Sequence, residues 1–205
     1  MPRKTARPSP TSGNACPTGI PGCFLVSITL RDVRPPVWRR IGVGDVSLDG
    51  LHAAIQAAMG WQEKHRHYFQ FADAWYGRPG RLDDRPFARE VRDSAAVTLG
   101  SLFAADDAAL RFLYVYDMGD QWEHEIVVER RTDAAGHSTA CLAGGRACPP
   151  EDCGGAGGYE YLLEVLGDPD HSEHLDVVES LGNHDPDEFD PEWATARMTR
   201  MLKAS

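Results

Sequence analysis

The sequence predicts an α+β fold: a mixed or antiparallel sheet with a central hairpin, one early helix, and C-terminal helices packed on the sheet. Apart from that early helix, apolar residues alternate as in strands up to Val128, and after Gly158 they recur at helical spacing. Strands gathered early and helices gathered late favour an α+β arrangement, because a parallel α/β sheet would alternate the two along the chain. The 205 residues suffice for one domain with a buried core.

Composition and charge are those of a folded, acidic protein. Hydrophobic residues make up 42% and charged residues 25%, and the formal net charge is -10. No segment reaches the roughly 18 consecutive apolar residues of a membrane-spanning helix, and no secretory leader is recognisable, so we expect a cytoplasmic protein that does not contact a membrane. Negative charge repels a phosphate backbone, so direct nucleic-acid binding is not expected. The five cysteines, an odd number without an export signal, are expected to be thiols.

The chain divides into a tail and one domain. Residues 1–22 contain five prolines among Ser, Thr, Gly and Arg, and they show no hydrophobic period. Such a segment cannot bury enough apolar surface to offset its conformational entropy. We therefore predict a disordered tail at 1–22 and a single α+β domain at 23–205.

The first half of the domain is predicted to be mainly strands. Alternation indicates a strand over 23–30, and a Pro-Pro pair separates it from a second strand over 37–43. A helix over 48–59 follows, with a serine before it as the N-cap and a glycine after it as the terminator. Residues 68–77 are predicted to form one more strand. Residues 78–93, rich in arginine and acidic residues, are predicted to form an exposed loop.

The clearest signal is a hairpin. Residues 110–116 and 122–128 each alternate, and both bury aromatic side chains on one face. The residues between them, Asp117 to Asp120, are typical of a turn. Beyond the hairpin, 144–158 is predicted to be a loop because of its glycines and prolines, and three helices are expected to follow it.

Three motifs contain the residues most able to do chemistry: Tyr116–His124, Cys148–Gly155 and Asp168–His174. From the first two we select a candidate binding surface, made of Asp117, Asp120, Trp122, His124, Glu151 and Asp152. If the hairpin end meets the glycine-rich loop, its carboxylates repel one another, and backbone N–H donors of that loop or a cation must offset this. Alternatively, the aspartates satisfy turn backbone and His124 is a hydrogen-bonded core residue.

A metal site is the second candidate. Cysteine and histidine are the preferred ligands of structural zinc, but the two cysteines are spaced more widely than in most zinc knuckles, and the histidines could be solvated surface residues. We therefore expect no cofactor, with zinc as the alternative. Its ligands would be Cys148, Cys153, His171 and His174.

The motifs, in their order and spacing, resemble the plasmid pRiA4b ORF-3-like family. The resemblance includes Trp38-Arg-Arg, Gly60-Trp61, the His65-x-His67 pair and Phe189-Asp190, and it spans almost everything after Cys23. It implies an α+β fold and a link with plasmids and transposons, and it implies no particular reaction.

Two hypotheses for function follow. In the first, the protein is a non-enzymatic accessory module of mobile elements that presents the glycine-rich loop and the acidic helices to a protein partner. Fourteen Asp and Glu and no Lys or Arg lie between Pro150 and Glu192. In the second, it is a metal- or cysteine-dependent hydrolase that uses His124, Cys148, Cys153, His171 and His174. A cleft gathering Asp120, His124, Glu151, His171 and His174 would favour the enzyme. The sequence predicts no particular oligomeric state.

Deleting residues 1–22 should leave thermal stability nearly unchanged, because this segment has no apolar pattern to bury. The measurement is the melting temperature of the truncated and full-length chains under one condition. A fall of about 5 °C or more would contradict the predicted disorder.

Overall fold

The computed structural model describes residues 24–78, 90–103, 109–131, 139–182 and 184–204. The predicted tail over 1–22 and Cys23 lie outside these residues. Cys141, Cys148 and Cys153 are free thiols. No helix in the described ranges combines the length and the apolar character needed to cross a bilayer.

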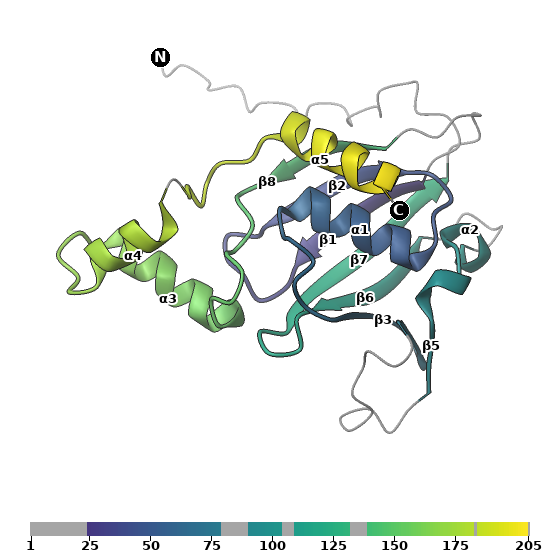
Figure 1. The fold of residues 1–205 in the computed structure, drawn as a ribbon, viewed down its shortest axis with the longest axis horizontal. Helices are drawn as coiled ribbons and strands as arrows, with labels where there is room; N and C mark the ends of the chain where they lie inside the picture. Colours follow the sequence, from purple (N-terminus) through teal and green to yellow (C-terminus); the bar gives the residue numbers. More distant parts are fainter. Residues whose placement is uncertain (1–23, 79–89, 104–108, 132–138, 183, 205) are drawn as a thin grey trace, which may run out of the picture.

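One eight-stranded mixed sheet forms the centre of the described structure (Figure 1). Its order is β5-β4-β3-β6-β7-β1-β2-β8, and every neighbouring pair is antiparallel except β4–β5, which is parallel. The strands are β1 (Phe24–Leu30), β2 (Trp38–Val43), β3 (His67–Phe71), β4 (Ala74–Gly77), β5 (Val91–Asp93), β6 (Leu110–Tyr116), β7 (Trp122–Arg131) and β8 (Ala140–Gly145).

The predicted hairpin is β6–β7, and it occupies the middle of the sheet. Its register places Tyr116 opposite Trp122, and Tyr114 opposite His124. All four side chains are at most 1% exposed. Cross-strand aromatic pairs on one buried face stabilise a hairpin through packing, so these pairs fix its register.

Two helices pack on the sheet. α1 (Leu48–Met59) begins at Ser47, whose side chain accepts a hydrogen bond from Gly50 N at 3.1 Å. α5 (Pro191–Ala204) begins at Asp190, whose Oδ1 accepts from the amides of Glu192 and Trp193. α5 contacts α1 and the edge strand β8. α1 lies across the sheet, which explains why all but two of its residues are buried.

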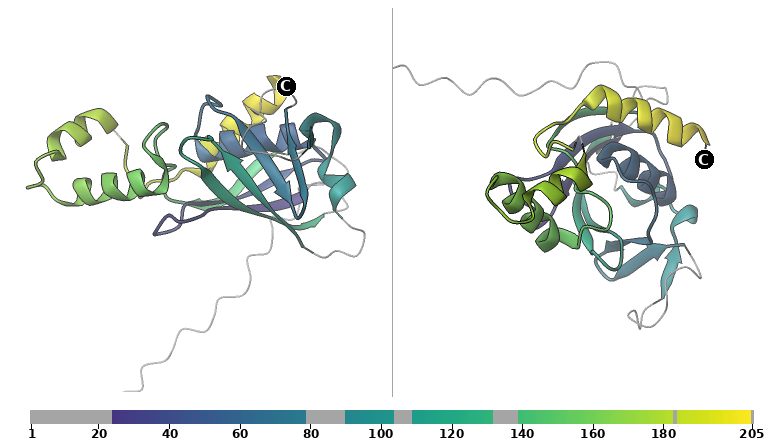
Figure 2. Two further views of the ribbon diagram at one scale, coloured as in Figure 1. Left: turned by 90° about the horizontal axis from the view of Figure 1, so that it is seen from below. Right: turned by 60° about the vertical axis from the view of Figure 1, so that its left-hand side comes forward.

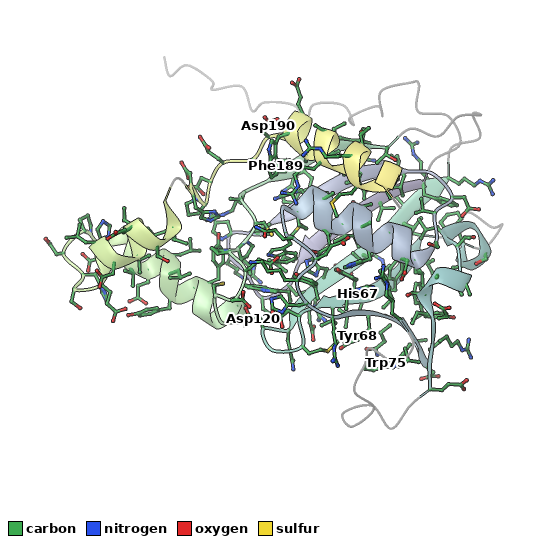
Figure 3. All side chains as sticks on the ribbon, in the orientation of Figure 1. His67, Tyr68, Trp75, Asp120, Phe189 and Asp190 are labelled. Carbon is green, nitrogen blue, oxygen red and sulfur yellow. The ribbon has the colours of Figure 1, made fainter. Side chains whose placement is uncertain are left out.

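A buried arginine joins these elements. Arg39 of β2 is 1% exposed and donates hydrogen bonds to the carbonyl oxygens of Ala58, at the end of α1, and Gly145, at the end of β8. Its guanidinium lies 3.8 Å from the centre of the Phe189 ring, just before α5. Figure 3 shows Phe189 and Asp190 entering that helix. The hydrogen bonds of Arg39 to the described residues all go to carbonyl oxygens.

The two remaining long helices form a projection that we call the arm, residues 155–181. α3 (Gly155–Gly167) and α4 (His174–Leu181) contact each other and extend sideways from the sheet (Figures 1 and 2). The sequence predicted C-terminal helices on the sheet, and α5 is the one that lies there. α4 has no buried residue, because its short apolar stripe faces solvent.

Several boundaries differ from the sequence-based expectation. The single strand predicted over 68–77 is a hairpin of β3 and β4, because the chain turns at Ala72, where φ is 44°. The loop predicted over 78–93 ends in β5, and its residues 79–89 lie outside the described ranges. The 144–158 loop is shorter than predicted, because α3 begins at Gly155.

Strand β8 and the short helix α2 (Leu99–Leu102) were missed by the sequence reasoning. β8 has small residues where a strand usually shows large alternating ones. Its last two glycines admit neighbouring side chains: a Cβ on Gly144 would lie 2.3 Å from the Phe189 ring, and one on Gly145 would lie 2.8 Å from Trp38 Nε1. The strand's composition is set by these contacts, which local propensity cannot indicate.

Replacing Trp122 with alanine should lower the free energy of unfolding by about 3–5 kcal/mol, because it leaves a cavity in the middle of the sheet. The matched control is Trp193→Ala, since Trp193 is 51% exposed. Chemical denaturation of both variants measures the effect. Equal losses in the two would contradict the central position of the hairpin core.

Candidate functional site

Three segments far apart in the sequence meet at the end of the β6–β7 hairpin. They are the turn after Tyr116, the residues leading into β3, and the loop 148–154. We call this place the junction. Trp61 Nε1 donates to Pro149 O at 3.0 Å, and Gly154 N donates to Asp120 Oδ2 at 3.1 Å. Figure 3 shows Asp120 beside the start of α3. The hairpin end and the glycine-rich loop therefore lie in contact.

Glycine is required where the loop enters α3. Gly155 has φ of 69°, and a Cβ there would lie 2.4 Å from the carbonyl oxygen of Asp120. A side chain at this position would clash with the hairpin turn and strain the backbone. The glycines thus permit the close approach that brings the loop to the hairpin.

His65 lies at the centre of the junction. Its Nε2 is 2.9 Å from Asp152 Oδ1, 3.5 Å from Asp117 Oδ2 and 3.7 Å from Glu151 Oε2. The ligand atoms of His65, Asp117 and Asp152 all lie within 4.8 Å of one another. Nevertheless, this nitrogen is shielded from solvent and makes no hydrogen bond of acceptable geometry with the described residues.

Asp117 has two separate roles. Its Oδ1 accepts from Gly119 N at 2.8 Å and from Asp120 N at 3.4 Å, which closes the turn as an Asx motif. Its Oδ2 faces His65 instead. The alternative in which Asp117 bonds to the backbone of the turn is therefore correct for its Oδ1. Its Oδ2 does not take part in the turn and contacts His65.

Glu151 is held by donors on two sides. Its Oε1 accepts from Gln62 N at 2.9 Å, and both of its oxygens lie 3.1 Å from the hydroxyl of Tyr116. Burial, followed by the negative charge of Glu151, raises the pKa of Tyr116, so this hydroxyl stays a donor. Backbone donors thus offset the carboxylate charge as expected, but only the amide of Gly154 comes from the glycine-rich loop.

A polar cleft of about 410 Å³ adjoins the junction, lined by His52, Glu63, Lys64, His65, Arg66, His67 and Arg78. Inside it the rings of His52 and His67 stack with centroids 3.5 Å apart. Burial lowers the pKa of His67 to about 4 and that of His52 well below its ordinary value. Two neutral imidazoles can stack without repulsion, which explains why both fit in one buried place.

His124 and Trp122 are not part of an exposed binding surface, contrary to the sequence-based selection. They are 0% and 1% exposed, because each lies on the core face of β7 opposite a tyrosine. His124 contacts the edge of Trp61, and its Nδ1 lies 3.3 Å from Tyr114 O. The alternative of a hydrogen-bonded core histidine is correct.

The four ligands proposed for zinc are not brought together. Among the described residues, no three of Cys148, Cys153, His171 and His174 have ligand atoms within 4.8 Å of one another. The histidines belong to the arm, where His174 Nδ1 lies 2.9 Å from Val165 O and His171 Nδ1 accepts from Glu173 N. Among the described residues, no three of Asp120, His124, Glu151 and these histidines have ligand atoms within 4.8 Å of one another, so the gathering that would have favoured a hydrolase is not observed.

The thiols are poorly suited to nucleophilic chemistry. Burial raises the pKa of Cys153 to about 11 and that of Cys148 well above its ordinary value. A cysteine nucleophile reacts as the thiolate and needs a lowered pKa. Both thiols therefore stay protonated at neutral pH, which argues against the cysteine-dependent alternative.

The arm presents a second candidate surface. Tyr161 is 43%, Leu175 79% and Val178 40% exposed. Seven acidic residues of the arm are exposed, and no Lys or Arg lies between Arg146 and Arg197. These acidic residues are Glu160, Glu164, Asp168, Asp170, Glu173, Asp176 and Glu179.

His65 is a residue of the candidate site that was not selected from the sequence. The His65-x-His67 pair was visible as a motif, but its partners are supplied by the hairpin turn and by the loop after β8. The alternation of the β3 segment could have indicated that the two histidines share a face. It could not have indicated which acids lie beside them.

Acid should destabilise the protein through His124. Burial lowers the pKa of His124 from 6.5 to about 4, so between these values the unfolded chain binds the additional proton. The free energy of unfolding should therefore fall as the pH drops through this window, by up to about 1.4 kcal/mol per pH unit for this residue. His124→Gln should show a correspondingly smaller slope in denaturation between pH 6 and pH 4.5. Equal slopes for variant and wild type would contradict the assignment.

Comparisons with known proteins agree with this fold. The family model described as "Plasmid pRiA4b ORF-3-like protein" matches residues 23–194. "Uncharacterized protein y4hQ" of Sinorhizobium fredii (strain NBRC 101917 / NGR234) is 37% identical over 181 residues, which cover 87% of this chain and 88% of y4hQ.

A solved structure is also similar. The crystal structure of "Protein of Unknown Function MM3350" from Methanosarcina mazei Go1 has a TM-score of 0.72 and 33% sequence identity. The match covers 83% of this chain and 96% of that one. With these likenesses and a family model that spans most of the domain, the chain belongs to the plasmid pRiA4b ORF-3-like family.

Proposed function

We propose that the protein is a non-enzymatic interaction module whose acidic arm binds a basic, partly apolar segment of a protein partner. The proposal places it in the cytoplasm, as an accessory to a mobile element. The family's description, which refers to a plasmid, supports that association. The exposed apolar side chains of the arm are the observation on which the proposal rests.

α4 leaves two of its four apolar side chains exposed to water. Leu175 and Val178 are three residues apart, so they lie on one face of the helix, and both are exposed. Full burial of an aliphatic side chain is worth about 1.5–3 kcal/mol. Binding of a partner that covers this face would gain this free energy of burial, because the folded protein alone does not bury these side chains.

Polar contacts connect α4 to α3 within the arm, whereas Tyr159 of α3 packs into the hydrophobic core of the sheet. Tyr161 Oη donates to Glu173 Oε2 at 3.1 Å, and His174 Nδ1 contacts Val165 O. A helix of eight residues is marginal on its own, so these contacts and the packing of α3 maintain it. They leave the outer face of α4 available for binding.

The charge of the arm indicates the chemistry of the partner. Seven exposed carboxylates on a segment that contains no Lys or Arg create a negative potential that attracts a basic segment and repels nucleic acid. An amphipathic helix with basic residues around an apolar stripe would match both properties of the arm. We therefore expect a partner segment of this kind.

The test uses a synthetic amphipathic peptide of lysine and leucine as the probe, with fluorescence anisotropy as the measurement. Binding should weaken as ionic strength rises. Leu175→Ala should weaken binding about tenfold through lost apolar contact. The triple variant Glu164→Gln, Asp176→Asn, Glu179→Gln should weaken it further and reduce the salt dependence. Leu175→Ala should change the free energy of unfolding by less than about 0.5 kcal/mol.

The matched control removes the same charge elsewhere. Asp73→Asn, Glu123→Gln and Glu125→Gln together neutralise three acids of the sheet, two of them exposed and one half-buried, away from the arm. This control should bind the peptide nearly as well as the wild type. If the two triple variants lose affinity equally, the attraction comes from net charge, and the proposed docking surface is wrong.

A further inference from the structure

We propose that the junction binds one divalent first-row transition-metal cation between His65, Asp117 and Asp152. The site is separate from the docking surface of the arm, so this inference does not depend on the proposed function. It also differs from the zinc site that the sequence indicated, since its ligand atoms are one imidazole nitrogen and two carboxylate oxygens.

The first argument is distance. Zinc binds histidine nitrogen at about 2.0–2.1 Å and carboxylate oxygen at about 2.0–2.2 Å, so two ligands of one ion lie about 3.0–3.5 Å apart at octahedral or tetrahedral angles. His65 Nε2 is 2.9 Å from Asp152 Oδ1 and 3.5 Å from Asp117 Oδ2. The two distances from His65 thus match the spacing of ligands that share one ion, and the ligand atoms of all three side chains lie within 4.8 Å of one another.

The second argument is the lack of a hydrogen-bond partner for His65 Nε2. This nitrogen is shielded from solvent, and its contact with Asp152 lacks the direction of a hydrogen bond. Asp117 is 6% exposed, and both turn amides bond to its Oδ1, so its Oδ2 faces His65. A buried imidazole nitrogen without a hydrogen bond therefore faces carboxylate oxygens from two segments.

The third argument is charge. Asp117, Glu151 and Asp152 surround a single imidazole, and no Lys or Arg of the described residues forms an ion pair with any of them. Asp117 and Glu151 are largely shielded from water, and carboxylates brought together in such a place repel one another unless a cation or hydrogen-bond donors offset their charge. Glu151 is already bonded to Gln62 N and Tyr116 Oη, so it adds negative charge at the edge of the site.

The ligand set indicates the class of cation. An imidazole nitrogen favours zinc and its first-row neighbours, carboxylates also suit manganese, and magnesium and calcium prefer oxygen alone. Such an ion would join the segment before β3, the hairpin turn and the loop that leads to the arm. Binding to the folded state alone raises the melting temperature through mass action.

The experiment uses the untagged full-length protein, freed of metal with a chelator that is then removed. Isothermal titration with zinc chloride, and separately with manganese chloride, should give about one ion per chain and a higher melting temperature. Asp152→Asn should weaken binding at least about tenfold. Its side chain is 61% exposed, so the fold tolerates this change. Asp117→Asn should do the same while keeping the oxygen that closes the turn.

The matched control is Asp187→Asn, an exposed aspartate that pairs with Arg146 outside the junction. It should bind the metal like the wild type. X-ray absorption of the zinc-loaded protein should show only nitrogen and oxygen ligands, at about 2.0–2.2 Å. Sulfur at about 2.3 Å would instead place zinc on the cysteines and overturn the proposal. So would the absence of stoichiometric binding, or equal affinity in Asp152→Asn and the wild type.

Discussion

The pairing of Tyr116 with Trp122 at the last position of the β6–β7 hairpin determines where the polar residues of the junction lie. Both rings are buried, so the strands cannot slip by one residue without turning these rings toward solvent. The turn must then begin at Asp117, directly above the core. Tyr116 also reaches out of the core, because its hydroxyl contacts Glu151 and the amide of Lys64. One aromatic residue thereby orders parts of all three junction segments.

The core beneath the junction is unusual in holding neutral histidines among aromatic rings. His124 contacts Trp61 and Tyr114, and His52 contacts Tyr114 and stacks on His67. Burial favours the uncharged form of each, so the positive charge of an imidazolium is excluded from the core. His65, by contrast, stands among carboxylates at the surface end of the same region. Depth within the fold thus separates the histidines packed among aromatic rings from the one that contacts carboxylates.

Much of the fold could be predicted because its signals are local. Residues close together in the sequence determine the N-caps of α1 at Ser47 and of α5 at Asp190. The same is true of the alternating apolar pattern of β1 and of the β6–β7 hairpin. β8 could not be predicted, because its glycines are needed to make room for the side chains of Trp38 and Phe189, which come from other segments. In the candidate site, too, some residues have a local sequence signal and others are brought in only by the tertiary structure. Asp117, Glu151 and Asp152 were selected from their motifs, whereas His65 was overlooked because only the tertiary structure places it among them.

Arg39 has a consequence for how the two helices stay attached. Its guanidinium bonds to carbonyl oxygens that end α1 and β8, and at the end of α1 the aligned peptide dipoles of the helix leave partial negative charge. An ion pair with a carboxylate would be lost when the carboxylate is protonated, whereas backbone carbonyls do not titrate. Salt weakens an ion pair at the surface, but it screens the electrostatic attraction of a buried contact only slightly. The ammonium group of a lysine concentrates its charge on one nitrogen, whereas the planar guanidinium of arginine has several N–H donors that can bond to separate carbonyl oxygens. The attachment of α1 to β2 and β8 therefore does not depend on the protonation state of a carboxylate, whereas the contact between the two helices of the arm includes an exposed hydrogen bond from Tyr161 to the carboxylate of Glu173.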